Sequence, residues 1–297
     1  MIYAICNPTA GSGRGEKIGH KIQAILDSER IPCRLRMTER PGHATELARQ
    51  ARDAQAETVL AIGGDGTAFE VARGLVGSDT PLGVIPAGTG NDFVKTIGVP
   101  QDPESALEYV LASEPQKTDV GEINGEMFLN EIGTGFDVSV LDYAAKAKKY
   151  CRGLLPYLYG VMQTLFRFHA VPITCSVDGG PAVTRDAFVV GVANGRWIGG
   201  GIGIAPDARA DDGLLDVVIV DKISRRKLLN RLIGLMKGKI LTFPETHFVR
   251  ASQVAFSAPA MRVNVDGEIL AMPSVQARVL PGALLVRRQG SGCSIGD

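Results

Sequence analysis

The chain has 297 residues and a mass of 31.5 kDa, which is enough for about two domains, each with its own core. Hydrophobic residues make up 45% of the chain and charged residues 22%, proportions that exclude a chain disordered throughout. Lys and Arg together number 32, as do Asp and Glu, so the protein as a whole has no net field that would attract nucleic acid. We therefore expect no nucleic-acid partner.

Strands and helices alternate over residues 1–120. Hydrophobic runs predict strands at 2–6, 33–37, 58–62 and 81–85, and helical spacing of apolar residues predicts helices at 16–29, 44–54 and 69–75. Glycine-rich turns follow the first, third and fourth strands. This alternation is typical of a parallel sheet wrapped by helices, and it predicts an α/β nucleotide-binding domain over residues 1–120.

After residue 120 the pattern changes to short strands without a helix between each pair. The strands are expected at 127–132, 173–177, 187–193, 215–220, 253–256, 261–265 and 275–279. They predict a β-sandwich-like domain over 121–282. A last strand follows Pro281-Gly282, and we expect residues 283–289 to rejoin the first domain and the tail, 290–297, to fray.

The five cysteines and four histidines are scattered singly and form no C-x-x-C or H-x-x-x-H pair. This spacing is typical of reduced thiols in a cytoplasmic protein without structural zinc. The longest uncharged apolar stretch near the middle lies between Arg152 and Arg167 and is interrupted by glycine and proline. A bilayer-spanning helix needs about 20 residues, so we expect none.

Glycine-rich turns at the carboxyl ends of parallel strands are places where an α/β sheet binds nucleotides, because free backbone N–H groups there can surround phosphate oxygens. The chain contains neither G-x-x-x-x-G-K-[ST] nor, at residues 11–15, G-x-G-x-x-G. The common nucleotide-binding signatures are therefore absent, and a plain strand-to-helix connection is the alternative interpretation of each turn.

Six motifs in register resemble those of the diacylglycerol kinase and sphingosine kinase catalytic family. They are residues 7–13 (NPTAGSG), 63–67 (GGDGT), 86–93 (PAGTGNDF), 117–121 (KTDVG), 211–214 (DDGL) and 264–268 (NVDGE). The resemblance covers nearly the whole chain and implies an ATP-dependent lipid kinase of phospholipid metabolism, with diacylglycerol as the leading substrate. The chain departs from the family pattern at Phe69, where an asparagine is usual.

The resemblance also implies which residues bind Mg²⁺-ATP. Asp65 would organise Mg²⁺, directly or through water, because a carboxylate beside phosphates needs a cation between them. The residues expected to contact the nucleotide are Asn7, Thr38, Gly63, Gly64, Asp65, Gly66, Thr67, Glu70, Gly88, Thr89 and Asn91.

Asp266 and Glu268 bracket Gly267 in a β-type segment, which by itself would be interpreted as a solvated hairpin turn. In the resembled family this acidic pair supplies the base that takes the lipid hydroxyl proton, with Asp119 nearby. The sequence does not separate Asp266 from Glu268 in this role. Asp65 completes the predicted catalytic set.

A further Mg²⁺ site is implied by the resemblance at Asp212 and the backbone carbonyls of Arg209 and Leu214, with Asp119 as another metal-associated carboxylate. An ordinary Asp-Asp-Gly turn explains the same residues equally well.

Two basic segments carry no acidic residue. Residues 143–170 include Lys146, Lys148, Lys149, Arg152 and Arg167, and residues 222–240 include seven Lys and Arg. Such segments either lie on an anionic membrane surface or form solvated helix faces. They favour a cytoplasmic protein that associates peripherally with the membrane where its lipid substrate lies, and the protein could also pair as a homodimer.

Two other functions compete with a lipid kinase. NAD kinases share the GGDGT motif and are of similar size, and Asn130-Glu131 resembles a later Asn-Glu motif of that family. Residues 86–92 (PAGTGND), however, do not match the glycine motif that NAD kinases have instead. A catalytically silent lipid-binding regulator is disfavoured by the intact Asp65, Asp266 and Glu268.

Overall fold

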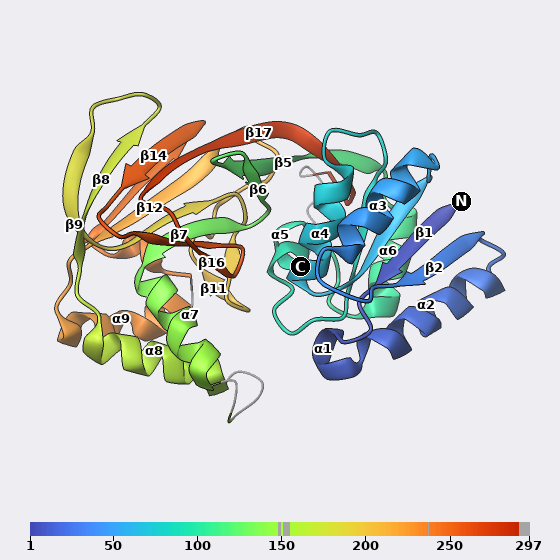
Figure 1. Cartoon of the computed structure of the whole chain (residues 1–297), viewed down its shortest axis with the longest axis horizontal. Coiled ribbons are helices and arrows are strands. Elements are labelled where there is room, and N and C mark those ends of the chain that lie inside the picture. The colour runs from blue at the N-terminus through green and yellow to red at the C-terminus, as the bar shows by residue number, and fades with distance from the viewer. Residues whose placement is uncertain (148–149, 151–154, 237, 291–297) are drawn as a thin grey trace. The chain divides into compact units, whose positions relative to one another are not determined.

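The structure is a computed structural model that describes residues 1–147, 150, 155–236 and 238–290 (Figure 1). The chain divides into two compact units. Unit 1 consists of Met1–Val120, Ala210–Asp212 and the segment from Pro281, and unit 2 consists of Gly121–Arg209 and Gly213–Leu280.

Unit 1 is built on a parallel sheet in the order β17-β4-β3-β1-β2. Its strands are β1 (Ile2–Cys6), β2 (Cys33–Met37), β3 (Thr58–Gly63), β4 (Leu82–Pro86) and the end of β17 (Ser274–Arg287). Strands β3 and β4 are buried along their whole length, as expected for central strands of a sheet covered on both faces. The four strands predicted in residues 1–120 therefore lie within one residue of their predicted bounds.

The helices of unit 1 are α1 (Ala10–Gly13), α2 (Gly15–Ser28), α3 (His43–Asp53), α4 (Asp65–Leu75), α5 (Asp92–Thr96) and α6 (Pro103–Ala112). Helix α4 starts at Asp65, four residues before the predicted start at 69, because the glycine turn itself forms its first turn. Helices α5 and α6 were not predicted. Asp102 caps α6 by accepting the N–H of Ser105, with Pro103 at the first helical position.

Unit 2 is an antiparallel assembly along the path β16-β15-β7-β9-β8-β14-β17, with β12 paired to β9 and β13. Its strands are β6 (Glu126–Phe128), β7 (Glu131–Gly135), β8 (Val171–Val177), β9 (Val183–Ala193), β10 (Trp197–Ile198), β11 (Ile202–Gly203), β12 (Leu215–Asp221), β13 (Thr246–Ala251), β14 (Gln253–Ser257), β15 (Arg262–Val265) and β16 (Glu268–Ala271). Strand β5 (Pro115–Ile123) begins in unit 1 and ends in unit 2. Inward side chains of β7, β9, β12, β14, β15 and β17 form one apolar core.

The helical part of unit 2 consists of α7 (Phe136–Ala147), α8 (Leu155–Arg167), α9 (Arg225–Met236) and the short 3-10 helix η1 (Ile240–Thr242). Figure 1 shows α7, α8 and α9 gathered at one end of the strands. No helix in the described part of the chain has the length and apolarity needed to cross a membrane.

Two sequence predictions need correction. The run 127–132 is not one strand: it divides into β6 and β7, because the N–H groups of residues 129–131 donate to the Asp266 carboxylate instead of a sheet partner. Residues 210–212, assigned to the second domain, belong to unit 1, where the carbonyl of Ala210 accepts the N–H of Asp119 at 2.7 Å. The return predicted at 283–289 starts at Pro281, and residues 291–297 of the tail lie outside the described residues.

Candidate functional site

Three glycine turns converge at the carboxyl edge of the unit 1 sheet. A Cβ atom on Gly88 would lie 2.5 Å from the Cα of Gly64, and a Cβ on Gly11 would lie 2.2 Å from the carbonyl oxygen of Ala87. Gly11 also has φ of 58°, a left-handed conformation that L side chains rarely adopt. The turns after β1, β3 and β4 therefore touch through their backbones, and no larger side chain fits between them.

A cavity of about 430 Å³ lies against these turns, wholly within unit 1. Seven of the residues expected to contact the nucleotide line it, namely Asn7, Thr38, Gly64, Gly66, Thr67, Glu70 and Gly88. The lining also includes Thr9 and Arg40, which the sequence analysis did not single out. Each lies two residues after a predicted residue, Asn7 or Thr38, just beyond a strand end, and this position was the signal available in the sequence. Backbone amides, hydroxyls and one guanidinium are groups that can bind phosphate oxygens.

The other four predicted residues do not line this cavity. Gly63 ends β3, and a Cβ there would lie 2.3 Å from the Oγ1 of Thr67. Thr89 is exposed, whereas Asn91 is buried in a left-handed conformation with φ of 52°. The Nδ2 of Asn91 donates to the carbonyl of Gly88 at 3.4 Å, so this side chain stabilises the turn after β4.

Asp65 begins α4 and accepts the N–H of Phe93 at 3.0 Å. Burial raises the pKa of its carboxyl, the N–H of Phe93 opposes this rise, and the charge of Asp92 adds to it. A cation beside Asp65 would offset both the burial and the repulsion from Asp92. The residue therefore fits the organisation of a divalent ion, as well as fixing the start of α5.

Glu70 has a structural role that the sequence did not indicate. Its Oε1 accepts the N–H of Gly42 at 2.9 Å and its Oε2 accepts the N–H of Ala44 at 3.1 Å. These N–H groups belong to the start of α3, where an acidic side chain satisfies unpaired donors and complements the helix dipole. Glu70 thus fixes α3 against α4 while lining the cavity.

In unit 2, Asp266 and Gly267 form the two-residue turn of the β15–β16 hairpin, with φ of 46° and 98°. Positive φ at both positions is required by the tight turns that suit paired strands. The Oδ1 of Asp266 accepts the N–H groups of Asn130 and Glu131 at 2.9 and 3.0 Å, and its Oδ2 accepts the N–H of Leu129. The carboxylate of Asp266 therefore anchors the hairpin to the start of β7.

Glu268 has a different environment. It is the first residue of β16, where its backbone pairs with Val265; its side chain is exposed and has no hydrogen bond or ion pair with any residue that the structure describes. The hairpin turn before it is held by the side chain of Asn264, whose Oδ1 accepts the N–H of Gly267 at 2.8 Å. Glu268 is thus an accessible carboxylate on a rigid support.

A carboxyl with buried oxygens lies beside this hairpin and was missed by the sequence analysis. Asp137 stands in the first turn of α7, and a Cβ on Gly133 of β7 would lie 2.4 Å from its Oδ2. Both carboxyl oxygens are buried, and neither has a hydrogen bond of normal geometry to another described residue. Burial raises the pKa of Asp137 from 3.8 to about 6, while the N–H of Val138 and the amide of Asn264 oppose the rise. The lack of a side chain at Gly133 is what makes room for this group.

Replacing Asp137 with Asn is expected to stabilise the protein above neutral pH. Because the folded-state pKa of about 6 lies above the unfolded value of 3.8, the folded protein binds the proton more tightly, and stability falls as pH rises from about 4 through about 6. The neutral amide does not incur this loss, so the variant should gain on the order of 1–3 kcal/mol in free energy of unfolding at pH 8. Urea unfolding of both proteins at pH 4, 6 and 8 measures the difference, and a difference that does not change with pH would contradict this account.

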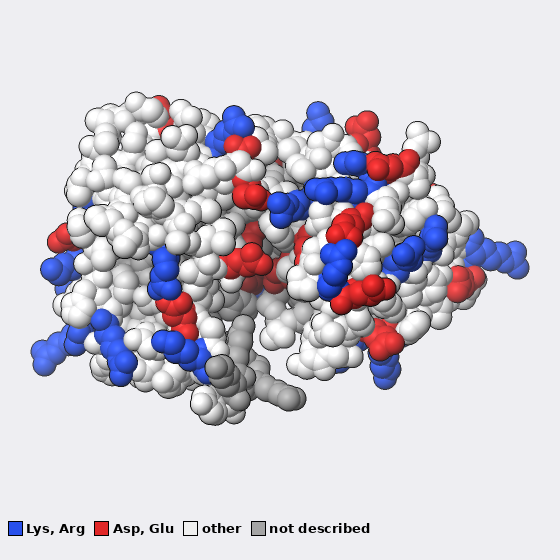
Figure 2. All heavy atoms as spheres, in the orientation of Figure 1, with Lys and Arg blue, Asp and Glu red and all other residues white. Residues whose placement is uncertain are grey.

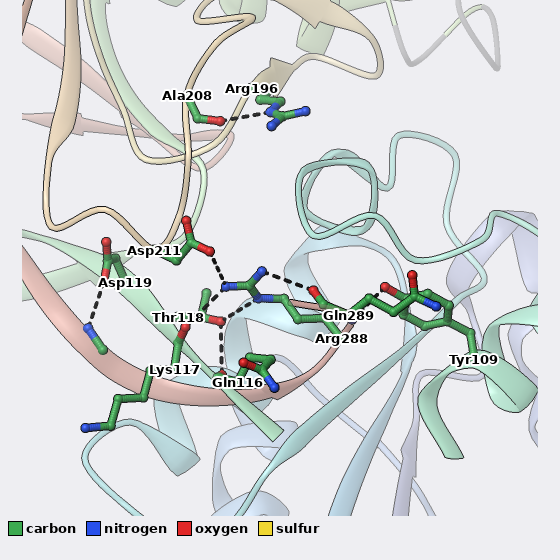
Figure 3. Close-up of polar contacts among 11 residues, drawn as sticks. Tyr109, Gln116, Lys117, Thr118, Asp119, Arg196, Ala208, Asp211, Arg288 and Gln289 are labelled. Atoms are coloured by element: carbon green, nitrogen blue, oxygen red, sulfur yellow. Dashed lines mark hydrogen bonds and ion pairs between the residues drawn. The ribbon is translucent and has the colours of Figure 1, made fainter. Parts of the chain in front are cut away.

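The region of the predicted second metal site holds a buried ion pair. The Arg288 guanidinium donates to Asp211 at 3.0 Å, to Thr118 at 3.1 Å and to the carbonyl of Lys117 at 3.2 Å (Figure 3). The Oδ1 of Asp119 accepts the N–H of Gly282 at 2.8 Å. These contacts join residues 117–119, 211 and 282–288, all within unit 1.

No group of three or more His, Cys, Asp or Glu side chains in the described part of the chain could hold a metal ion. Arg209 is exposed, and Asp212 and Leu214 are partly buried. The site that the resemblance implies uses backbone carbonyls and a single carboxylate from this loop, with Asp119 as a further carboxylate, and it stays a prediction.

A backbone-lined cavity at the carboxyl edge of a parallel sheet is typical of nucleotide-binding α/β domains. Comparison with known proteins gives the family. Residues 1–123 match the diacylglycerol kinase catalytic domain, and residues 130–288 match the YegS C-terminal NAD kinase beta sandwich-like domain. The chain belongs to the diacylglycerol kinase and YegS-like lipid kinase family, and it is a kinase.

Relatives are similar over nearly the whole chain. A diacylglycerol kinase from Mycobacterium tuberculosis is 30% identical over 98% of this chain and 96% of its own. A probable lipid kinase YegS-like from Pseudomonas aeruginosa is 33% identical over 92% of this chain and 91% of its own. The predicted family and the predicted fold class, an α/β domain followed by a β-sandwich-like domain, are confirmed.

Solved structures have the same fold. Two crystal structures of proteins from Bacillus anthracis each align with 98% of this chain and 98% of their own. The first has a TM-score of 0.80 at 26% identity, and the second, of a diacylglycerol kinase, has a TM-score of 0.75 at 23% identity. An NAD kinase from Archaeoglobus fulgidus has a TM-score of 0.53 at 12% identity, over 97% of this chain and 94% of its own. The similarity to NAD kinases therefore extends to the fold alone.

Proposed function

We propose that this kinase transfers the γ-phosphate of Mg²⁺-ATP to the hydroxyl of a membrane lipid, and that diacylglycerol is the acceptor. The observation that carries the proposal is the cavity in unit 1, where three glycine turns meet backbone to backbone and residues of three family motifs line the space. Relatives named as diacylglycerol kinase support the choice of acceptor.

In the proposed reaction the turns after β3 and β4 bind the phosphates through backbone N–H groups, and Arg40 and Thr67 add a positive charge and a hydroxyl. Asp65 would hold Mg²⁺, directly or through water. When bound, Mg²⁺ neutralises charge that develops on the transferred phosphoryl group.

Glu268 is the proposed general base. It takes the proton of the lipid hydroxyl as that oxygen bonds to the γ-phosphorus, the bond to the bridging oxygen breaks, and ADP leaves. The choice of Glu268 over Asp266 rests on their surroundings: Glu268 is exposed, whereas the Asp266 oxygens already accept three backbone N–H groups.

Transfer of labelled γ-phosphate from ATP tests the proposal. The purified chain is given mixed micelles of diacylglycerol, ceramide, sphingosine or monoacylglycerol in turn, and soluble NAD in a parallel reaction. Labelled phosphatidic acid is the expected product. Label on NAD alone would replace the proposal with the NAD kinase alternative, and label on another lipid would keep the lipid kinase and correct its acceptor.

A further inference from the structure

Helix α8 presents a row of large apolar side chains at the surface of unit 2. Its exposed side carries the five large apolar residues Leu155, Leu158, Tyr159, Met162 and Phe166, which we call the α8 stripe. Their spacing of three and four residues places them on one side of the helix. Leu158 is 51% exposed and Phe166 is 60% exposed. Large apolar side chains grouped on one exposed helix side form an unusual surface for a protein in water.

The opposite side of α8 is fixed to the rest of unit 2. Val161, Thr164 and Leu165 are buried, and a Cβ on Gly160 would lie 2.3 Å from the carbonyl oxygen of Val140 in α7. The two helices thus approach closely at Gly160. The stripe therefore has a fixed orientation and is not a helix face that could simply turn inward.

Lys and Arg side chains lie on α8 and on its two neighbouring helices. Lys146 and Arg167 lie over the ring of Tyr143, at 5.2 and 5.9 Å from its centre. Helix α9, which contacts α8, begins with the exposed cations Arg225, Arg226 and Lys227, of which Lys227 forms an ion pair with Glu245 at 3.2 Å. In Figure 2, Lys and Arg side chains gather over the end of unit 2 where Figure 1 places α7, α8 and α9.

The sequence shows the same charge pattern: residues 143–170 and 222–240 contain twelve Lys and Arg and no Asp or Glu. Lys148, Lys149 and Arg152, which belong to the first segment, lie outside the described residues.

From this combination we infer that the α8 stripe inserts into the headgroup region of an anionic bilayer while the cations on α7, α8 and α9 bind the lipid phosphates. Amphipathic helices of this kind lie in the membrane plane with their apolar side about 5–10 Å deep. Charge complementarity favours the bilayer over a second copy of the chain, because a symmetric dimer through the stripe would bring the basic residues of both copies together. The inference deepens the proposed function, which requires access to a lipid in a membrane.

Vesicle sedimentation without ATP tests the docking surface. The probes are vesicles of phosphatidylcholine with 30% phosphatidylglycerol, and vesicles of phosphatidylcholine alone. Leu158→Ser and Phe166→Ser should each weaken binding to the anionic vesicles roughly tenfold, because each variant removes a large apolar side chain from the interface. The matched control is Phe248→Ser in β13, where a phenylalanine of unit 2 is 41% exposed but lies outside α8.

The charge contribution is tested separately. Lys146→Gln and Arg167→Gln should each weaken binding about fivefold at low salt, and the effect should shrink as salt screens the surface. Three results would overturn the inference: no binding of the parent to anionic vesicles, equal loss in Phe248→Ser and Phe166→Ser, or a parent dimer that Leu158→Ser dissociates without changing vesicle binding.

A soluble substrate separates this inference from the proposed function. With a short-chain diacylglycerol below its critical micelle concentration, Leu158→Ser and Phe166→Ser should phosphorylate the substrate as fast as the parent, while phosphorylation of vesicle-bound diacylglycerol falls with vesicle binding. Parent activity on the soluble substrate without any vesicle binding would refute the docking surface alone. Vesicle binding without phosphorylation of any diacylglycerol would refute the proposed function alone.

Discussion

Replacing Glu268 with Gln is expected to lower kcat by roughly 10²- to 10⁴-fold while ATP affinity stays near that of the parent. A lipid hydroxyl is a poor nucleophile at neutral pH, so loss of the group that takes its proton affects the chemical step most. The amide of Gln occupies almost the same space as the carboxylate but cannot accept a proton. The variant should therefore fold normally, since the Glu268 side chain is exposed and has no hydrogen-bond or ion-pair partner in the described part of the chain.

Asp266→Asn is the informative companion variant. An amide offers one acceptor oxygen and presents a donor to backbone N–H groups, so the contacts with Leu129, Asn130 and Glu131 cannot all be kept. Its main expected effect is a loss of about 1–3 kcal/mol in free energy of unfolding. Any fall in kcat should be smaller than that of Glu268→Gln.

Measurement of kcat, ATP affinity and urea unfolding for both variants separates the two roles. If Asp266→Asn loses activity at parental stability while Glu268→Gln keeps it, the assignments must be exchanged. Near-parental turnover by both would move the base to another carboxylate, and Asp119 would be the next to test.

The sequence predicted best where local pattern and tertiary environment agree. Strands β3 and β4 are continuous hydrophobic runs because both faces of the sheet are covered, and such runs are visible without the structure. The break between β6 and β7 was not visible, because it depends on a carboxylate 135 residues further along the chain. Long-range hydrogen bonds of this kind leave no periodic signal in the segment that they interrupt.

The candidate site also combines features that the sequence predicted with features that depend on tertiary packing. Glycines that let backbones approach were identified from their motifs, and Gly64, Gly66 and Gly88 line the cavity. The cap that Glu70 provides for α3 depends on how two helices pack, which the motif does not encode. Asp137 was missed for the same reason, since its burial follows from the space above Gly133 on a neighbouring element.

Gly64→Val is expected to reduce ATP binding at least 100-fold and to abolish turnover with it. A Cβ at this position would lie 3.2 Å from the Cα of Gly88, and the two methyl groups of valine add bulk where backbone N–H groups would face the phosphates. Gly64→Ala should have a smaller effect, because a Cβ alone is a tight contact that a small shift of the turn relieves. The graded loss from Ala to Val is the signature of steric exclusion from a backbone-lined site.

Isothermal titration with ATP and Mg²⁺ measures the affinity, and circular dichroism with thermal unfolding checks the fold. Gly290→Val is the matched control in unit 1: Gly290 is exposed, and its nearest neighbour would lie 3.9 Å from the new Cβ. The control should bind ATP like the parent. If Gly64→Val fails to fold, the Ala variant still tests the site, because a purely structural effect would lower its unfolding temperature without changing ATP affinity. A folded Gly64→Val protein with parental affinity would place the phosphates away from the turn that joins β3 to α4.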